Sequence, residues 1–308
     1  MPQNRSKGIN IKDMENKIID GKAVSDQIKK EIAAEVADML DSGLPAPHLA
    51  AVIVGDDGAS RTYVASKEKA CQSVGMVSSV YRLPVTTTEK EMLDMVAFLN
   101  KDEDIDGYII QLPLPKHINE TKIINAIAPE KDVDGFTAVN VGRLQIGQPC
   151  FVPATPNGIM ELVKRCDIET AGKNVVVLGR SNIVGTPISV LMSRKGVDAT
   201  VTMCHSKTKN IAEICRQADI LVVAIGKQHF LTADMVKPGA VVIDVGIHRI
   251  DDATSPKGYR ICGDVDYDEV SKVASKITPV PGGVGPMTIV SLLQNTLNAA
   301  KHVIYPKD

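Results

Sequence analysis

Short runs of β-branched and aliphatic residues alternate along the chain with segments whose apolar positions recur every three or four residues. Residues 19–40 show the second pattern, because Val24, Ile28, Ile32 and Val36 share one helical stripe. In the first half we expect strands at 49–54, 77–83 and 108–112, and helices at about 60–73, 88–99 and 119–128. In the second half we expect strands at 175–178, 200–204, 220–225 and 241–245, helices beginning near 185 and 210, a short helix at 232–236 and a last helix at 288–301. This alternation predicts an α/β fold with parallel strands and right-handed crossovers.

The length predicts two domains around a cleft. A chain of 308 residues exceeds the size at which one hydrophobic core usually stops growing, and small molecules tend to bind between domains. We expect a polar tail over residues 1–16, an N-terminal α/β domain over 17–134 and a Rossmann-like, doubly wound parallel sheet over 135–285. The last helix could dock on either domain, and we expect residues 286–308 to pack back on the first.

Composition and charge narrow the class of protein. The 35 basic side chains nearly balance the 37 acidic ones, so no global field attracts nucleic acid or an anionic membrane. The six cysteines form no CxxC pair, which is typical of reduced thiols and predicts neither a disulfide nor a metal site. No apolar run is long enough to span a bilayer, and the polar start lacks the core of a secretion signal. We therefore expect a soluble cytoplasmic protein.

A dinucleotide-type turn follows a buried-type strand and opens a helix in NVVVLGRSNIVGTP, residues 174–187. Its spacing is not the standard GxGxxG, because Gly179 and Ser181 take the first two positions, Val184 replaces the third glycine and Gly185 comes one residue late. The amides at the start of a helix can still face a phosphate. A plain glycine-containing turn between a strand and a helix is the alternative.

The residues after the next strand favour NADP over NAD. An NAD site usually places Asp or Glu about 20 residues beyond the glycines, whereas the second strand here ends in MCHSKT, without an acid. Ser206 and Lys207 can donate to a phosphate, and Arg180 stands in the first turn. A solvated surface turn is the alternative for these three residues. Farther on, Gly246 and Ile247 follow a strand at the carboxyl edge of the sheet and could touch a cofactor ribose.

A phenol and an amine share one helical face in the first half of the chain. Tyr63 and Lys67 are four residues apart in a helix that follows a strand and a glycine-containing turn. Together they could stack on an aromatic ligand and transfer a proton. Alone, the pair also fits an exposed helix face that carries Lys67 and Lys69.

Three further motifs offer polar groups or close backbone approach. Gln111 leaves an apolar strand in IIQLPLP, where it could bond a neighbouring lysine or only its own loop. The turn in KDVDGF holds Asp132 and Asp134; a turn aspartate usually caps backbone, but an ionised carboxylate can also grip an N–H and an amino group. The segment ITPVPGGVGPMT, residues 277–288, sets Pro281 and three glycines in one loop. Such a loop could let the backbone approach a flat ring closely. The alternative is a loop that only connects the domains.

Taken in order, these segments resemble the bifunctional methylenetetrahydrofolate dehydrogenase/cyclohydrolases over residues 18–304. The resemblance is carried by the helix with Tyr63, Lys67 and Cys71, then by QLPLP, KDVDGF, GRSNIVG and PVPGGVGPMT. It implies NADP-dependent oxidation of 5,10-methylenetetrahydrofolate to 5,10-methenyltetrahydrofolate and hydrolysis of that product to 10-formyltetrahydrofolate. It also implies a homodimer that serves one-carbon metabolism and purine biosynthesis, with folate and the catalytic groups on the N-terminal domain and NADP on the other.

The resemblance implies a role for each matching residue. Lys67 would be the essential catalytic lysine and Gln111 the partner that tunes it, while Tyr63 would stack on the aminobenzoyl ring of folate and Asp134 would grip the pterin. The other residues expected to line the folate are Ile110, Leu112, Pro281, Gly282, Gly283, Val284 and Gly285. The expected cofactor contacts are Gly179, Arg180, Ser181, Ser206 and Ile247.

Two other classes of protein compete with this interpretation. A different NADP enzyme on a similar frame, such as a shikimate or amino-acid dehydrogenase, would need other groups in place of Tyr63, Lys67 and Asp134. A cofactor-sensing binding protein without catalysis would not need Lys67 and Gln111 together. An absorbance assay with methylenetetrahydrofolate and NADP separates the catalytic interpretation from the sensing one.

Overall fold

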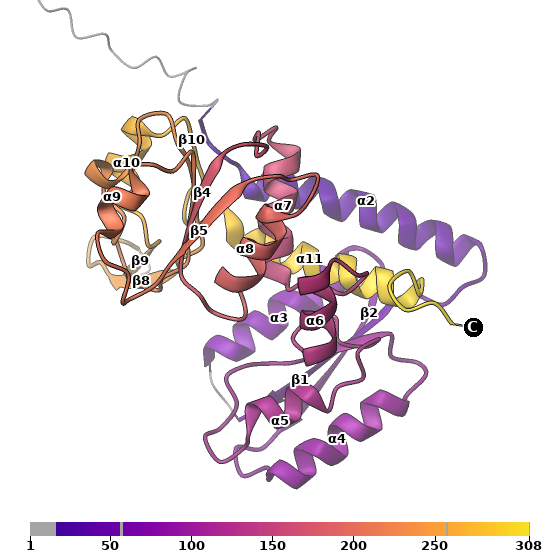
Figure 1. Ribbon diagram of the computed structural model, residues 1–308. Coiled ribbons are helices and arrows are strands. Elements are labelled where there is room, and N and C mark those ends of the chain that lie inside the picture. Colours follow the sequence, from indigo (N-terminus) through magenta and orange to yellow (C-terminus); the bar gives the residue numbers. More distant parts are fainter. Residues whose placement is uncertain (1–16, 56–57, 257, 308) are drawn as a thin grey trace, which may run out of the picture.

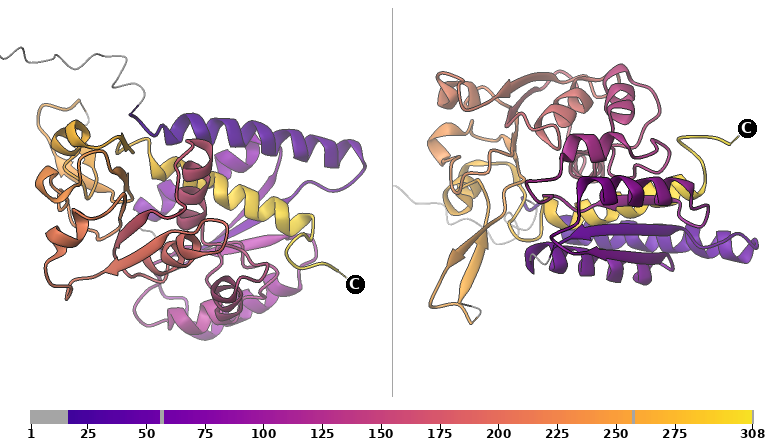
Figure 2. Two further views of the ribbon diagram at one scale, coloured as in Figure 1. Left: turned by 45° about the horizontal axis from the view of Figure 1, so that its top comes forward. Right: turned by 90° about the horizontal axis from the view of Figure 1, so that it is seen from below.

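The computed structural model describes residues 17–55, 58–256 and 258–307, and the expected tail over residues 1–16 lies outside them. Two parallel sheets make up the centre of the molecule (Figure 1). The smaller sheet has the order β2 (Val77–Leu83), β1 (His48–Val54), β3 (Gly107–Ile110), and the larger has the order β10 (Lys276–Ile277), β7 (Val241–Asp244), β6 (Ile220–Val223), β4 (Asn174–Leu178), β5 (Thr200–Cys204). An antiparallel pair, β8 (His248–Asp251) and β9 (Tyr259–Cys262), projects from the side of the larger sheet (Figure 2). The expected α/β fold class is confirmed.

Helices cover both faces of the smaller sheet. On β1, Ala50 and Val52 belong to a buried cluster with Met92, whereas Leu49 and Ile53 belong to a second cluster on the other face. Burial on both faces explains why this strand is apolar throughout instead of alternating. The helices packed around the sheet are α2 (Gly21–Asp41), α3 (Gly58–Ser73), α4 (Glu89–Lys101) and α5 (Glu120–Asn125).

Helices also cover both faces of the larger sheet. Val175 and Val177 of β4 pack in the cluster that contains Ile188, and Val176 and Leu178 pack in the cluster on the opposite face. The first face carries α7 (Ala154–Arg165) and α8 (Gly185–Ser193); the second carries α9 (Ile211–Cys215), the 3-10 helix η1 (Ala233–Met235) and α10 (Tyr267–Val273). The chain leaves β4 toward β5 and then returns to β6 on the other side, so the strand order reverses at β4. Ligands of open parallel sheets bind beyond the carboxyl ends of the strands at such a reversal.

Helix α11 (Val284–Ala300) runs between the two sheets and packs against α7, α2 and α3 (Figure 1). Its residue Met287 is fully buried in one continuous cluster that contains residues of both β1 and β4. The Asn295 side chain donates to the carbonyl oxygens of Val133 at 2.8 Å and of Val152 at 2.9 Å. Helix α11 therefore joins the two sheets through this cluster, and its buried bond to Val133 fixes the turn over residues 131–136.

The structure corrects the boundaries of the last helix and of β3. The helix begins at Val284 rather than at residue 288, so Val284 and Gly285 form its first turn and are not part of the expected glycine loop. Pro286 is compatible with that first turn, because its missing N–H would have no helical partner there. Strand β3 ends at Ile110, two residues earlier than expected, because the prolines that follow cannot continue the ladder.

Other differences concern elements that the periodicity did not predict. The expected helix over residues 232–236 is the three-residue 3-10 turn η1. The helices α6 (Ala138–Ile146) and α7 were not expected, because Gly142, Pro156 and Gly158 interrupt their helical pattern. Among the described residues, no helix has the combination of length and apolar character needed to cross a membrane.

Candidate active site

Lys67 lies on α3 and is almost fully buried, with 8% of its surface exposed. Burial lowers the pKa of its amine, and the nearby carboxylate of Asp134 opposes this shift. The Nζ atom donates to Gln111 Oε1 at 3.4 Å and lies 4.4 Å from the centre of the Tyr63 ring. The alternative of an exposed helix face is therefore wrong for Lys67, although Lys69 is exposed.

Gln111 is held so that its side-chain oxygen faces this amine. Its backbone N–H donates to the carbonyl of Val52 at 2.8 Å, which places it directly after β3 beside β1. Its Nε2 donates to the carbonyl of Leu112 at 2.9 Å, so the amide nitrogen is engaged by its own loop. The side-chain oxygen of Gln111 is therefore available to accept the hydrogen bond from Lys67. Both bonds that the sequence offered as alternatives are present, and a neutral partner holds the amine without adding a charge.

Asp134 supplies the negative charge of the site, and Asp132 supplies its support. Burial raises the pKa of Asp134 to about 6, against the opposing influence of Lys67. Asp132 is buried and accepts hydrogen bonds from the backbone N–H of Thr137 at 2.8 Å and from Asn140 Nδ2 at 2.9 Å. Asp132 therefore caps the turn, while Asp134 is only half-buried and acts on Lys67 through its field.

Tyr63 connects α3 to the beginning of α11. Its hydroxyl lies 3.1 Å from Thr288 Oγ1, and Thr288 donates to the carbonyl of Gly285 at 2.8 Å. The side chain is 39% exposed, so part of the ring is open to a stacking partner. Gly282 has a φ of +106°, and its carbonyl accepts from the backbone N–H of Lys22 at 2.9 Å. This bond fixes the proline–glycine loop against the start of α2.

The other residues expected to line the folate differ in which of their atoms are accessible to a ligand. Ile110 and Val284 are buried in apolar clusters, so only their backbone is available to a ligand. Leu112 is half-buried and Pro281 is exposed. Gly283 is buried where an added Cβ would lie 2.6 Å from neighbouring atoms, so this position requires glycine.

The turn after β4 brings backbone into close contact with β6. Gly179 has a φ of +124°, and an added Cβ would collide with the carbonyl oxygen of Ala224. Gly185, the first residue of α8, packs so closely against Gly179 that an added Cβ would collide with its carbonyl. Gly185 therefore supplies the close helix–strand packing for which the third glycine of a standard fingerprint is used. The N-terminal amides of α8 begin at the reversal of strand order, where a phosphate is favoured.

The polar residues expected at the phosphates are exposed around this turn. Arg180 and Ser181 follow β4, and Ser206 and Lys207 follow β5, the neighbouring strand. Because parallel strands end at the same edge, these groups share one side of the strand reversal. Ile247, which is 65% exposed, lies beyond the end of β7 on the other side.

Sequence reasoning missed several polar residues that hold the site together: Thr288, Asn295, Asp244 and Asp264. Nothing in the sequence pairs Tyr63 with a threonine 225 positions farther along. For Asp244 one signal was available, since it ends the apolar strand β7. An acid in such a position is costly unless backbone N–H groups surround it.

The fold and the site define the class: a two-domain α/β enzyme with a dinucleotide-type strand reversal beside a buried lysine. Comparison with known families likewise gives a catalytic and a nucleotide-binding part. Residues 19–134 match the catalytic domain of tetrahydrofolate dehydrogenase/cyclohydrolase, and residues 153–304 match the NAD(P)-binding domain of the same family. The chain belongs to the tetrahydrofolate dehydrogenase/cyclohydrolase family, which confirms the resemblance carried by its motifs.

Relatives match the chain over nearly its whole length. The bifunctional protein FolD of Bacteroides fragilis is 59% identical over 290 residues, which are 94% of this chain and 99% of the relative. The crystal structure of the bifunctional enzyme FolD from Campylobacter jejuni is 46% identical with a TM-score of 0.88, covering 93% of this chain and 99% of that one. The methylenetetrahydrofolate dehydrogenase-cyclohydrolase of Trypanosoma brucei, solved with NADP and an inhibitor, is 41% identical with a TM-score of 0.88, covering 94% and 98%.

Proposed function

We propose that one folate site, built around Lys67, serves both activities of this chain. The activities are the NADP-dependent oxidation of 5,10-methylenetetrahydrofolate to 5,10-methenyltetrahydrofolate and the hydrolysis of that product to 10-formyltetrahydrofolate. The observation that carries the proposal is a buried amine whose pKa is lowered, held by a neutral amide and placed near a carboxylate. The methenyl substrate is itself a cation, which disfavours an ammonium still further.

In the hydrolytic step Lys67 acts as base and then as acid. Water adds to the methenyl carbon, and one of its protons passes to the uncharged Nζ. The bond from this carbon to N5 of the pterin then breaks, the ammonium returns its proton to N5, and the remaining hydroxyl proton leaves to solvent as the formyl group forms. Gln111 keeps the amine in register through both transfers, because its oxygen accepts from Nζ in either protonation state.

Asp134 and Tyr63 place the folate over this amine. The carboxylate of Asp134 can accept from an N–H and an amino group of the pterin at once, as charge-assisted hydrogen bonds. The part-exposed ring of Tyr63 provides the flat surface for the aminobenzoyl group. The loop over residues 281–283 and the first residues of α11 close the other side of the site, with Thr288 joining them to Tyr63.

The larger sheet provides the place for NADP, which accepts a hydride from the methylene carbon. The close backbone approach at Gly179 and Gly185 fits a pyrophosphate at the N-terminus of α8. Arg180 and Ser206 would hold the 2′-phosphate, since both are exposed donors at the ends of neighbouring strands. In this division residues 17–134 supply the folate side, together with 286–308, and residues 135–285 supply the cofactor side.

The direct test is an absorbance assay with methylenetetrahydrofolate and either NADP or NAD. Formation and then decay of the methenyl product is the expected result, with faster formation in NADP. Absence of formation with both cofactors would contradict the dehydrogenase proposal, and formation without enzymatic decay would contradict the hydrolytic one.

The location and the assembly of the chain are also part of this proposal. We propose a cytoplasmic homodimer that supplies formyl groups to purine biosynthesis, and the six free cysteines are consistent with a reducing compartment. Light scattering coupled to gel filtration should give twice the chain mass of 33.0 kDa. A measured mass equal to that of one chain would contradict the proposed homodimer.

A further inference from the structure

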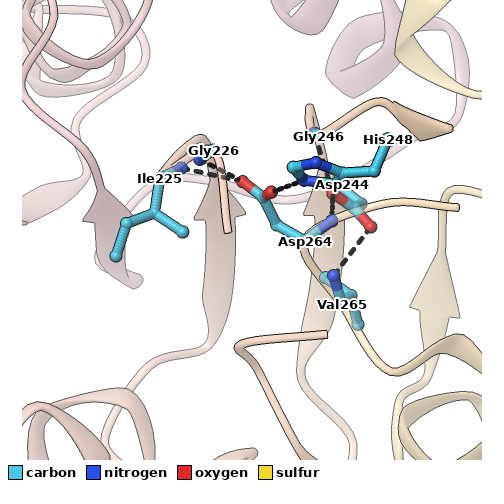
Figure 3. Close-up of polar contacts among 7 residues, drawn as sticks. All are labelled: Ile225, Gly226, Asp244, Gly246, His248, Asp264 and Val265. Carbon is cyan, nitrogen blue, oxygen red and sulfur yellow. Dashed lines mark hydrogen bonds and ion pairs between the residues drawn. The ribbon is translucent and has the colours of Figure 1, made fainter. Parts of the chain in front are cut away.

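Two buried aspartates, Asp244 and Asp264, lie near the carboxyl ends of β6 and β7 and are not among the residues expected to contact folate or NADP (Figure 3). Asp244 is the last residue of β7, and Asp264 follows β9. Among the described residues, the basic group at Asp264 is the His248 ring. Burying two carboxylates without a lysine or arginine partner costs free energy. Their hydrogen bonds therefore indicate which parts of the chain they fix.

Asp264 connects the loop after β6 to the segment after β7. One of its oxygens accepts from the backbone N–H groups of Ile225 at 2.8 Å and Gly226 at 2.9 Å. The other oxygen lies 2.7 Å from Nε2 of His248, the first residue of β8, whose side chain is 23% exposed. One carboxylate thus holds the loops that follow two adjacent strands.

Asp244, at the end of β7, binds the backbone of the segments that follow β7 and β9. It accepts from the backbone N–H groups of Gly246 at 2.9 Å and of Asp264 and Val265 at 3.0 Å. An added Cβ at Gly246 would collide with Asp264, and one at Gly263 would collide with the carboxylate of Asp244. The sequence therefore leaves two positions without side chains so that these carboxylates can reach the backbone.

The network lies where the nicotinamide half of the cofactor is expected. Arg180 and Ser206 are on one side of the strand reversal, at the ends of β4 and β5. A dinucleotide spans such a reversal, so its other half lies beyond β6 and β7. There the exposed Ile247 has its Cδ1 3.8 Å from the position that a Cβ would take at Gly285 in α11. Ile247 therefore stands between the cofactor edge and the folate side.

We propose that His248, Asp264 and Asp244 are positioning residues for hydride transfer, because they fix Ile247 and the loop after β6 against the nicotinamide ring. The inference rests on the dehydrogenase activity proposed above. The Nε2–H of His248 donates to Asp264, and none of the three residues touches the reacting atoms. The reacting atoms must lie about 3–3.5 Å apart, and a displacement of about 1 Å can slow a reaction on the order of 100-fold.

The test compares His248→Leu, which removes the donor, with His248→Gln, whose amide can reach the same oxygen. In His248→Leu we expect dehydrogenase kcat to fall on the order of 10–100-fold, and in His248→Gln most of it should return. Calorimetry should show weaker NADP binding in His248→Leu and unchanged binding of adenosine 2′,5′-bisphosphate, a probe of the phosphate end. Cyclohydrolase activity without nucleotide should stay at the wild-type rate, since in the described part of the chain Lys67 and Gln111 share no hydrogen bond with this network.

Several results would overturn the inference. They are an unchanged dehydrogenase in His248→Leu, an equal loss of affinity for NADP and for the bisphosphate, and no recovery in His248→Gln. If His248→Leu does not fold, His248→Asn takes its place, because the shorter amide cannot reach Asp264. Failure of the proposed function is a separate result, since it would appear as a wild-type protein that does not oxidise methylenetetrahydrofolate.

Discussion

The proposed folate side and the proposed cofactor edge of this protein are built from different kinds of group. On the folate side the important atoms belong to side chains: the amine of Lys67, the amide of Gln111 and the carboxylate of Asp134. At the cofactor edge they belong mainly to backbone, because Gly179 and Gly185 bring main chain together and exposed donors surround them. Burial follows this division, since Lys67 is 8% exposed and Ile247 is 65% exposed. Truncating a side chain should therefore damage the folate side more than the cofactor edge.

The largest effect is expected from Lys67→Met, which removes the amine and keeps an unbranched apolar chain in its buried place. General acid–base catalysis contributes about 10²–10⁴-fold, so cyclohydrolase kcat should fall by that order. NADP affinity should stay near the wild-type value, because the cofactor edge is untouched. Hydrolysis of methenyltetrahydrofolate at the wild-type rate by this variant would remove Lys67 from the mechanism.

The next effect is expected from Asp134→Ala, which should weaken folate binding by about 2–5 kcal/mol if the carboxylate forms buried, charge-assisted bonds with the pterin. The measurement is a calorimetric Kd for a folate ligand, with NADP affinity as the control on the cofactor edge. Asp132→Ala is a useful contrast, since Asp132 caps the turn and its loss should lower the melting temperature instead. Unchanged folate affinity in Asp134→Ala would exclude the proposed contact.

Smaller changes are expected at the cofactor edge, where Arg180→Ala and Ser206→Ala together should reduce NADP affinity by about tenfold or more and leave NAD affinity nearly unchanged. Charge pairs at exposed positions contribute up to about 1 kcal/mol each, so the loss of two such contacts corresponds to roughly tenfold or somewhat more. Titration with both cofactors measures the difference. Equal losses for NADP and NAD would place the 2′-phosphate elsewhere.

The contrast between the two regions also explains what the sequence could predict. The folate side was predictable in its parts, because Tyr63 and Lys67 are one helical turn apart and Gln111 ends a clear strand. Their convergence was less predictable, since it depends on α11 bonding Tyr63 and the turn before Asp134 from far along the chain. Local periodicity carries no information on such long-range bonds.

At the cofactor edge the missing information was of another kind. The strand-to-helix turn at Gly179 was identified, but its departure from standard spacing made sense only when Gly185 was seen against the Gly179 carbonyl. The buried network at Asp244 and Asp264 was missed, because its partners are backbone N–H groups of residues up to 39 positions away. The helix start at Val284 was also wrong in prediction, since proline and glycine are compatible with a first turn.

The smallest expected effect is a gain in stability from Asp134→Asn. The folded-state pKa of about 6 exceeds the usual 3.8, so the folded protein binds this proton more tightly and loses stability as the pH rises between these values. At pH 7.5 the substitution should therefore stabilise the protein, on the order of 1–2 kcal/mol after allowance for solvent screening at this half-buried site. The gain should vanish near pH 4. Urea unfolding at both pH values measures it, and an equal effect at both would contradict the raised pKa.

The central claim is that burial lowers the pKa of the Lys67 amine so that it can accept a proton, and NMR titration of the lysine side chains tests it most directly. With ¹⁵Nζ-labelled lysine, the signal that is missing from the Lys67→Met spectrum should titrate well below the ordinary lysine pKa of about 10.4, because burial disfavours its charge. The exposed lysines of the same sample provide the reference. A Lys67 signal that titrates with them, or above them, would contradict the account.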